Sequence, residues 1–160
     1  MTPEQYIQKL TDLSLKKLDN MKKILNLTKK QFEVITEDSI NELQSLIDLK
    51  QKLIDEINEL DDAFEVYYSR LKSILGIESM EEVSISKYNE AVKLQQTIRE
   101  IFDTAKKIQT TENENNLKAR GVLDSLGGQI RQIKQGKIAN SGYNIGGKIP
   151  QQSYYFDTKK

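Results

Sequence analysis

The strongest periodic pattern in the chain lies in residues 39–75, SINELQSLIDLKQKLIDEINELDDAFEVYYSRLKSIL. Side chains of this segment fall into three neighbouring rows with a seven-residue repeat: Ile40, Ile47, Ile54, Asp61, Tyr68, Leu75; Leu43, Lys50, Ile57, Phe64, Leu71; and Leu46, Leu53, Leu60, Tyr67, Ile74. The third row is entirely apolar, and three adjacent rows make a stripe wide enough to contact two other helices. The pattern therefore predicts a long helix at the centre of a three-helix arrangement.

The residues before this segment predict a first helix over about 3–35. Thr2 suits the N-cap, Pro3 suits the first helical position, and Gln5 completes a Thr-x-x-Gln capping box. The same segment contains a heptad seam at Leu18, Met21, Leu25, Thr28, Phe32 and Ile35. Residues 36–38 interrupt the pattern, so a tight turn is expected there.

A third helix is expected over about 86–134, because Gly76 is a natural end for the second helix and apolar periodicity resumes after it. Residues 109–116 contain no apolar side chain. We interpret this block as a solvated hinge; the alternative is that Asn113, Asn115 and Asn116 are buried polar residues that set the register of the bundle.

The predicted fold is all-α. An antiparallel hairpin (about 3–35 and 39–75) and the long third helix form an elongated three-helix bundle, or coiled coil, over residues 1–135. Proline occurs only at positions 3 and 150, which leaves this whole region free to be helical. Residues 136–160 are rich in Gly, Asn, Ser and Gln and predict a flexible tail.

Composition disfavours most catalytic functions. The chain has no cysteine, histidine or tryptophan, so disulfides and thiolate chemistry are excluded and the commonest metal ligand and general base is missing. Paired carboxylates such as Asp61-Asp62 and Glu81-Glu82 lie on periodic helices and are interpreted as solvated. We therefore expect no enzymatic activity, no metal and no cofactor.

The partners that composition favours are other proteins. The 24 basic and 24 acidic residues balance, which argues against nucleic acid as the main partner. No apolar run approaches the roughly 18 residues of a membrane span, and the N-terminus lacks the pattern of a secretory signal. A cytoplasmic protein that does not insert into membranes is expected.

The third helix is the expected binding element. If continuous, it would reach ~70–75 Å, against ~50–55 Å for each of the other two, so its last part would project beyond the bundle. The apolar residues expected to bind a partner there are Leu117, Val122, Leu123, Leu126, Ile130 and Ile133. Burying six such side chains is worth on the order of 10 kcal/mol gross. In the alternative interpretation, the helix stops at Gly127 and the following residues fold back.

The C-terminal tail contains a second candidate. Tyr154, Tyr155 and Phe156 stand together in an otherwise polar segment. They are either a short docking motif or a chance cluster.

The sequence resembles the FlgN family of flagellar export chaperones. The likeness rests on the break at Thr36-Glu37-Asp38, on LIDLKQKLIDEINEL at 46–60, on an asparagine-rich passage followed by Leu117, and on a tail with Tyr143 and SYYFDTKK. The family often has a doubled leucine where this chain has Leu117-Lys118.

The resemblance implies a cytoplasmic chaperone for hook-associated proteins of the hook–filament junction. It would bind amphipathic C-terminal helices of these clients, keep the clients unassembled and deliver them to the flagellar type III export gate. Two alternatives stay open: a structural coiled-coil protein that self-associates through its third helix, and a related chaperone for another client such as the filament cap. Monomer and weak homodimer are both compatible with the sequence.

Overall fold

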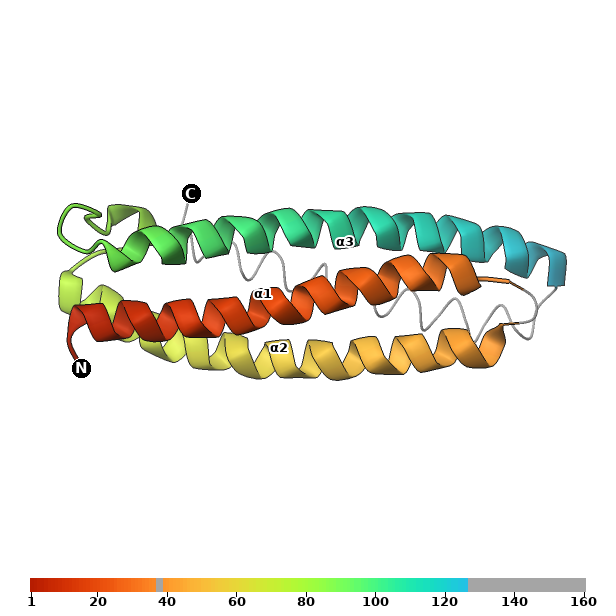
Figure 1. Ribbon diagram of the computed structural model, residues 1–160, viewed down its shortest axis with the longest axis horizontal. Helices are drawn as coiled ribbons and strands as arrows, with labels where there is room; N and C mark the ends of the chain where they lie inside the picture. Colours follow the sequence, from red (N-terminus) through yellow and green to blue (C-terminus); the bar gives the residue numbers. More distant parts are fainter. Residues whose placement is uncertain (37–38, 127–160) are drawn as a thin grey trace.

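The computed structural model of the protein describes residues 1–36 and 39–126. Within those ranges the chain forms α1 (Pro3–Val34), α2 (Ile40–Leu75), the short 3-10 helix η1 (Met80–Glu82) and α3 (Glu90–Leu126), with no strand. The three long helices lie side by side in an elongated bundle, with α2 antiparallel to α1 and α3 (Figure 1). The predicted all-α class is confirmed. The tail predicted over 136–160 lies outside the described residues.

The helix ends follow from local sequence. At the start of α1 the Thr2 hydroxyl accepts a hydrogen bond from the Gln5 backbone N–H at 3.2 Å, and the Gln5 side chain accepts one from the Thr2 N–H at 2.8 Å. This is the predicted capping box, and Pro3 occupies the first turn. α2 ends at Gly76, whose φ of 65° lies in the left-handed region that favours glycine. Both ends lie where the sequence predicts them.

α3 begins at Glu90, four residues after the predicted start. The preceding residues turn instead: the Tyr88 N–H donates to the Ser84 carbonyl at 2.8 Å, and the Ala91 N–H donates to the Tyr88 carbonyl at 3.0 Å. Met80, Val83 and Tyr88 are buried in the core at this end of the bundle. The Tyr88 side chain is thus buried from the turn that precedes α3, and the helix begins after it.

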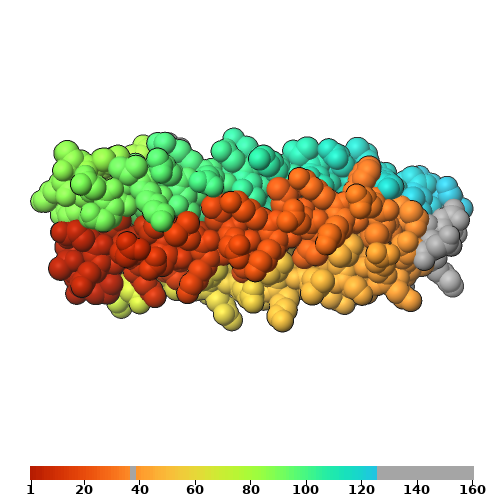
Figure 2. Space-filling view, in the orientation of Figure 1, coloured from red at the N-terminus to blue at the C-terminus, as the bar shows by residue number. Residues whose placement is uncertain are grey.

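α1, and not α2, is the central helix. Backbones approach closely between α1 and α2 and between α1 and α3, but only sparsely between α2 and α3. Figure 2 shows α1 along the middle of the viewed face, between the other two helices. Small buried side chains of α3 permit its close approach to α1. Large buried side chains of α2, such as Phe64 and Tyr68, lie between α2 and α3 and keep the two backbones further apart. The predicted central position of the second helix is therefore wrong.

The position of α1 leaves the third apolar row of α2 incompletely covered. Leu46, Leu53, Leu60 and Tyr67 are half-buried, and Ile74 is 50% exposed. The stripe predicted from the sequence exists, but one edge of it lies along the outer side of the α1–α2 hairpin.

Apolar side chains form three clusters along the bundle. The first, at the end that holds η1, is the largest and includes Leu10, Phe64, Tyr68 and Ile98. The middle cluster contains Leu18, Met21, Ile24, Ile54, Ile57, Ile101, Ala105 and Ile108. Among the residues that the structure describes, the buried members of the third cluster, next to the α1–α2 turn, are Ile35, Leu43, Ile47, Ala119 and Leu123. Over the described residues, the core thus becomes smaller toward the C-terminal end of α3.

Buried polar groups separate the clusters. Lys17 and Asp61 form an ion pair at 2.8 Å between the first and middle clusters. Asp61 is only 9% exposed, so its interpretation as a solvated carboxylate is wrong: the cation on α1 makes its burial tolerable. Between the middle and third clusters, Lys50 of α2 pairs with Glu112 of α3 and donates to the Gln31 side-chain oxygen of α1 at 2.6 Å.

The Lys50–Glu112 pair gives a direct test of this layered core. The variant Lys50→Met leaves the Glu112 carboxylate buried without its cation, and breaking a buried pair in this way typically costs about 3–5 kcal/mol. The free energy of unfolding in urea, followed by far-ultraviolet circular dichroism, should fall by about that amount. The double variant Lys50→Met/Glu112→Met should recover most of the loss, because both charges are then replaced by apolar side chains.

The matched control is Lys23→Met. Lys23 pairs with Asp19 at 3.2 Å, but its side chain is 59% exposed, so the loss should be at most about 0.5 kcal/mol. A double variant no more stable than Lys50→Met alone would contradict the assignment.

Candidate functional site

The C-terminal part of α3, residues 117–126, is the candidate binding segment. It packs against the end of the α1–α2 hairpin: Ala119 and Leu123 are each 3% exposed and lie against Ile35, Leu43 and Ile47. The expectation that α3 projects beyond the bundle from Leu117 onward is therefore wrong for residues 117–126. α3 starts only at Glu90, after residues 76–89 have closed the other end of the bundle, so its residues 119–123 lie level with the start of α2.

The predicted partner-binding residues fall into three groups. Leu117 points away from the core and is 68% exposed, more than any other large apolar side chain that the structure describes. Val122 is half-buried beside the third cluster and Leu123 is buried within it. Leu126 is the last residue of α3. Ile130 and Ile133 lie outside the described residues, as do the three aromatic residues of the predicted docking motif, Tyr154, Tyr155 and Phe156.

Lys118, the residue after Leu117, joins the candidate segment to α1. Its ammonium lies 4.2 Å from the centre of the Phe32 ring and donates a hydrogen bond to the Phe32 carbonyl. That carbonyl belongs to the last turn of α1, which has no basic residue of its own. A cation at this position is favoured both by the ring and by the negative end of the helix dipole.

A layer of buried polar residues marks the start of the candidate segment. Besides the Lys50–Glu112 pair, the Asn115 side-chain amide donates to the Thr28 carbonyl at 2.9 Å. Glu112 is 1% exposed and Asn115 is fully buried. α3 continues through residues 109–116 without a break. The interpretation of this block as a solvated hinge is therefore wrong. Asn115 is instead a buried polar residue, as the alternative interpretation predicted.

The spacing along α3 contains the signal that could have identified this layer. Glu112 and Asn115 continue the alternating four- and three-residue steps of Ile101, Ala105 and Ile108, and Ala119 follows at the next step. Glu112 therefore belongs to the buried seam of α3, as Lys50 belongs to a buried row of α2. A basic residue in the buried seam of one helix and an acidic residue in the buried seam of another indicate that the two side chains form an ion pair.

Burial lowers the pKa of the Lys50 ammonium, and the neighbouring Glu112 carboxylate offsets part of that shift. The cation stays in the core because Glu112 and Gln31 both accept hydrogen bonds from it. This layer isolates the third cluster from the larger clusters. Within residues 1–36 and 39–126, the end of α3 is therefore held by few apolar side chains. The largest buried one on α3 is Leu123, and its full burial is worth about 1.5–3 kcal/mol.

The most exposed large apolar side chain that the structure describes lies at the end of α3. Across residues 1–36 and 39–126, no three carboxylates come together in a way that could hold a metal ion. No helix in this part of the chain is long and apolar enough to cross a membrane. At the end of α3, by contrast, an exposed leucine adjoins a small apolar cluster that a second amphipathic helix could contact.

Comparison with known proteins identifies the family. Residues 1–151 match the family described as FlgN protein. No curated protein and no solved structure shows a significant match. The family match covers all of the described residues, and the resemblance noted from the sequence is confirmed. The chain belongs to the FlgN family of flagellar export chaperones.

Proposed function

We propose that this chain binds amphipathic C-terminal helices of hook-associated proteins from the hook–filament junction, keeps these clients unassembled in the cytoplasm and delivers them to the flagellar export gate. Membership of the FlgN family supports binding of flagellar substrate proteins. The single observation that carries the location of the site is the end of α3, where the exposed Leu117 precedes a small, isolated apolar cluster.

The proposed binding mode exchanges one set of apolar contacts for another. Leu117 and the half-buried Val122 make the first contacts with the client helix. A client helix with apolar residues at i, i+3, i+4 and i+7 then competes with Leu123 for Ile35, Leu43 and Ile47. The exchange costs little because similar apolar surface is buried before and after it. Leu126, Ile130 and Ile133 extend the proposed surface.

Gly121 makes this exchange easier. It lies within α3, and a glycine in a helix interior is about 1 kcal/mol less favourable than alanine. The segment that must separate from the hairpin therefore contains a residue that weakens its helix. The Lys50–Glu112 layer, about two and a half turns before Gly121, keeps the rest of α3 in place.

Leu117→Asp tests the location of the site. Because Leu117 is 68% exposed, the substitution should change the free energy of unfolding by no more than about 0.5 kcal/mol. Client binding should fall by at least about tenfold, since a carboxylate then faces the client's apolar stripe. The measurement is co-purification of a hook-associated protein with the full chain, alongside thermal unfolding.

Val66→Asp is the matched control for this substitution. Val66 is 47% exposed and lies on α2, far along the bundle from the end of α3, so this variant should retain its client. If the Leu117→Asp variant recovered the client normally, Leu117 would not be part of the binding site. Using the filament-cap protein as the client in the same assay tests the alternative cargo.

Gly121→Ala tests the exchange itself. A Cβ atom at this position meets no other atom within 4 Å, so the substitution should stabilise the end of α3 by up to about 1 kcal/mol. If α3 must release Leu123 before the client binds, affinity should fall by up to about fivefold. Isothermal titration calorimetry with a synthetic C-terminal client helix measures this change. An unchanged or higher affinity would instead indicate that the client packs on an intact α3.

A further inference from the structure

A groove runs along the outer side of the α1–α2 hairpin, and its lining residues all belong to these two helices. Leu27 of α1 and Leu49 and Leu53 of α2 form its apolar surface. Leu49 is 51% exposed, and Leu27 and Leu53 are half-buried. A second, polar hollow adjoins this one at Glu56, so the groove continues along the hairpin toward Leu60.

The apolar surface of this groove has the repeat of a helix-packing face. Leu46, Leu53 and Leu60 belong to one heptad row of α2, and the row is only half-buried. A pair of antiparallel helices has two sides on which a further helix can pack, and α3 occupies one of them (Figure 1). The side that carries Leu27, Leu49 and Leu53 is the other. It has the geometry to receive a fourth helix.

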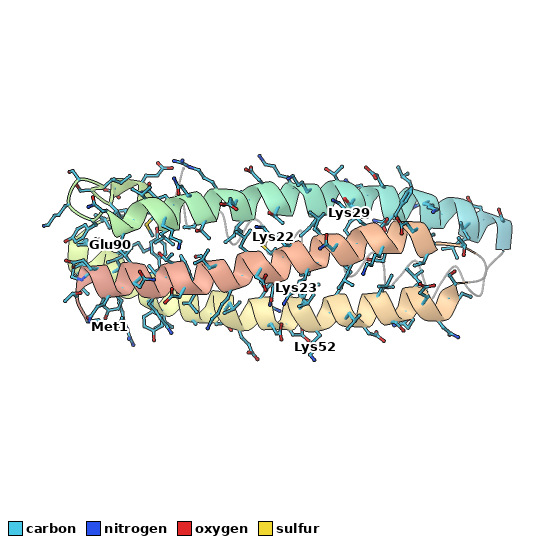
Figure 3. The ribbon with its side chains drawn as sticks, in the orientation of Figure 1. Met1, Lys22, Lys23, Lys29, Lys52 and Glu90 are labelled. Carbon is cyan, nitrogen blue, oxygen red and sulfur yellow. The ribbon has the colours of Figure 1, made fainter. Side chains whose placement is uncertain are left out.

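Lysines surround the apolar surface. Lys23, Lys30 and Lys52 line this part of the groove together with one acidic residue, Glu56. Lys23 lies at the α1–α2 seam, whereas Lys22 points toward α3, where it pairs with Glu100 (Figure 3). Neither Lys30 nor Lys52 forms an ion pair with any residue that the structure describes. The chain as a whole is neutral, so this concentration of positive charge is local.

We propose that this groove is a second docking surface, which binds an acidic amphipathic helix of a partner protein. Apolar residues of that helix pack on Leu27, Leu49 and Leu53, and its acidic residues face Lys23, Lys30 and Lys52. The chain's own segment after Gln129 does not suit the site, because it carries six basic residues and one acidic residue. The surface lies apart from the end of α3 and does not depend on the proposed client site.

The charge pattern also sets the direction of the bound helix. The adjoining hollow is lined by Asp19, Glu56 and Glu59 with the single cation Lys16, so the groove changes from basic to acidic along its length. The negative C-terminal end of a helix dipole is favoured beside the lysines and the positive end beside the carboxylates. The partner helix therefore runs parallel to α1 and antiparallel to α2.

The test uses the full chain and a labelled synthetic amphipathic peptide of about three heptads, with leucine at the core positions and glutamate on both flanks of its C-terminal half, which faces the lysines. Fluorescence anisotropy should show binding that weakens as salt is added. A matched peptide with lysine in place of glutamate should bind at least about tenfold more weakly. Equal binding of the two peptides would overturn the proposal.

Substitutions then locate the bound peptide. Lys30→Glu/Lys52→Glu and Leu49→Asp should each weaken binding of the acidic peptide by about tenfold, and all three positions are exposed enough to leave folding intact. The matched controls are Lys106→Glu/Lys107→Glu on α3 and Val66→Asp, at exposed positions that do not line the groove. These controls should bind normally, as should Leu117→Asp. An equal loss in the control variants would place the peptide elsewhere and contradict the proposal.

Vesicles of phosphatidylcholine with phosphatidylglycerol test whether the groove binds an anionic membrane surface instead of an acidic helix. The groove is concave and its leucines lie between lysine side chains, which suits a helix better than a flat membrane surface. Sedimentation with these vesicles should therefore leave the chain in the supernatant. Vesicle binding that Leu49→Asp abolishes, without binding of the acidic peptide, would overturn the proposal in favour of a membrane contact.

Discussion

A lysine ammonium in the interior of a helical bundle needs an anion and further acceptors at its own level, and in this protein that requirement aligns all three long helices. Lys50 of α2 finds Glu112 on α3 and Gln31 on α1. Moving α3 by about one turn would bring an apolar residue such as Ile108 opposite the ammonium. Both the Lys50 ammonium and the Glu112 carboxylate would then be buried without a partner of opposite charge. Apolar contacts alone tolerate such slips more readily, so the polar layer determines the register.

The same layer divides the core into parts of unequal strength. The large clusters toward the η1 end hold the three helices together, whereas the end of α3 rests on a small cluster around Leu123. An export chaperone must bind its client firmly and later release it. In the proposed binding mode, the short apolar segment separates from the hairpin while the polar layer holds the rest of α3, which allows both without unfolding the bundle.

The central position of α1 has a second consequence, on the opposite side of the molecule. Because α1 contacts both other helices, the α1–α2 hairpin covers only part of the broad apolar stripe of α2, and Leu49 and Leu53 remain accessible beside Lys30 and Lys52. The end of α3 and this groove differ in charge and in position. The two proposed docking surfaces therefore suit helices of different chemistry.

Helix positions were predictable from the sequence because they depend on neighbouring residues: the capping box at Thr2, the left-handed turn at Gly76 and the periodicity of residues 39–75 are all local. The apolar residues of the candidate segment were identified from the same periodicity, and their role in binding stays a prediction. The order of the helices was not predictable, because it depends on how faces from distant segments fit. The burial of Glu112 and Asn115 follows the seam spacing of α3, but the identity of their partners does not, because these lie 62 and 87 positions away in the chain. Local hydrogen bonding makes the helices, but only their packing decides which buried polar side chains meet and which leucines stay exposed to water.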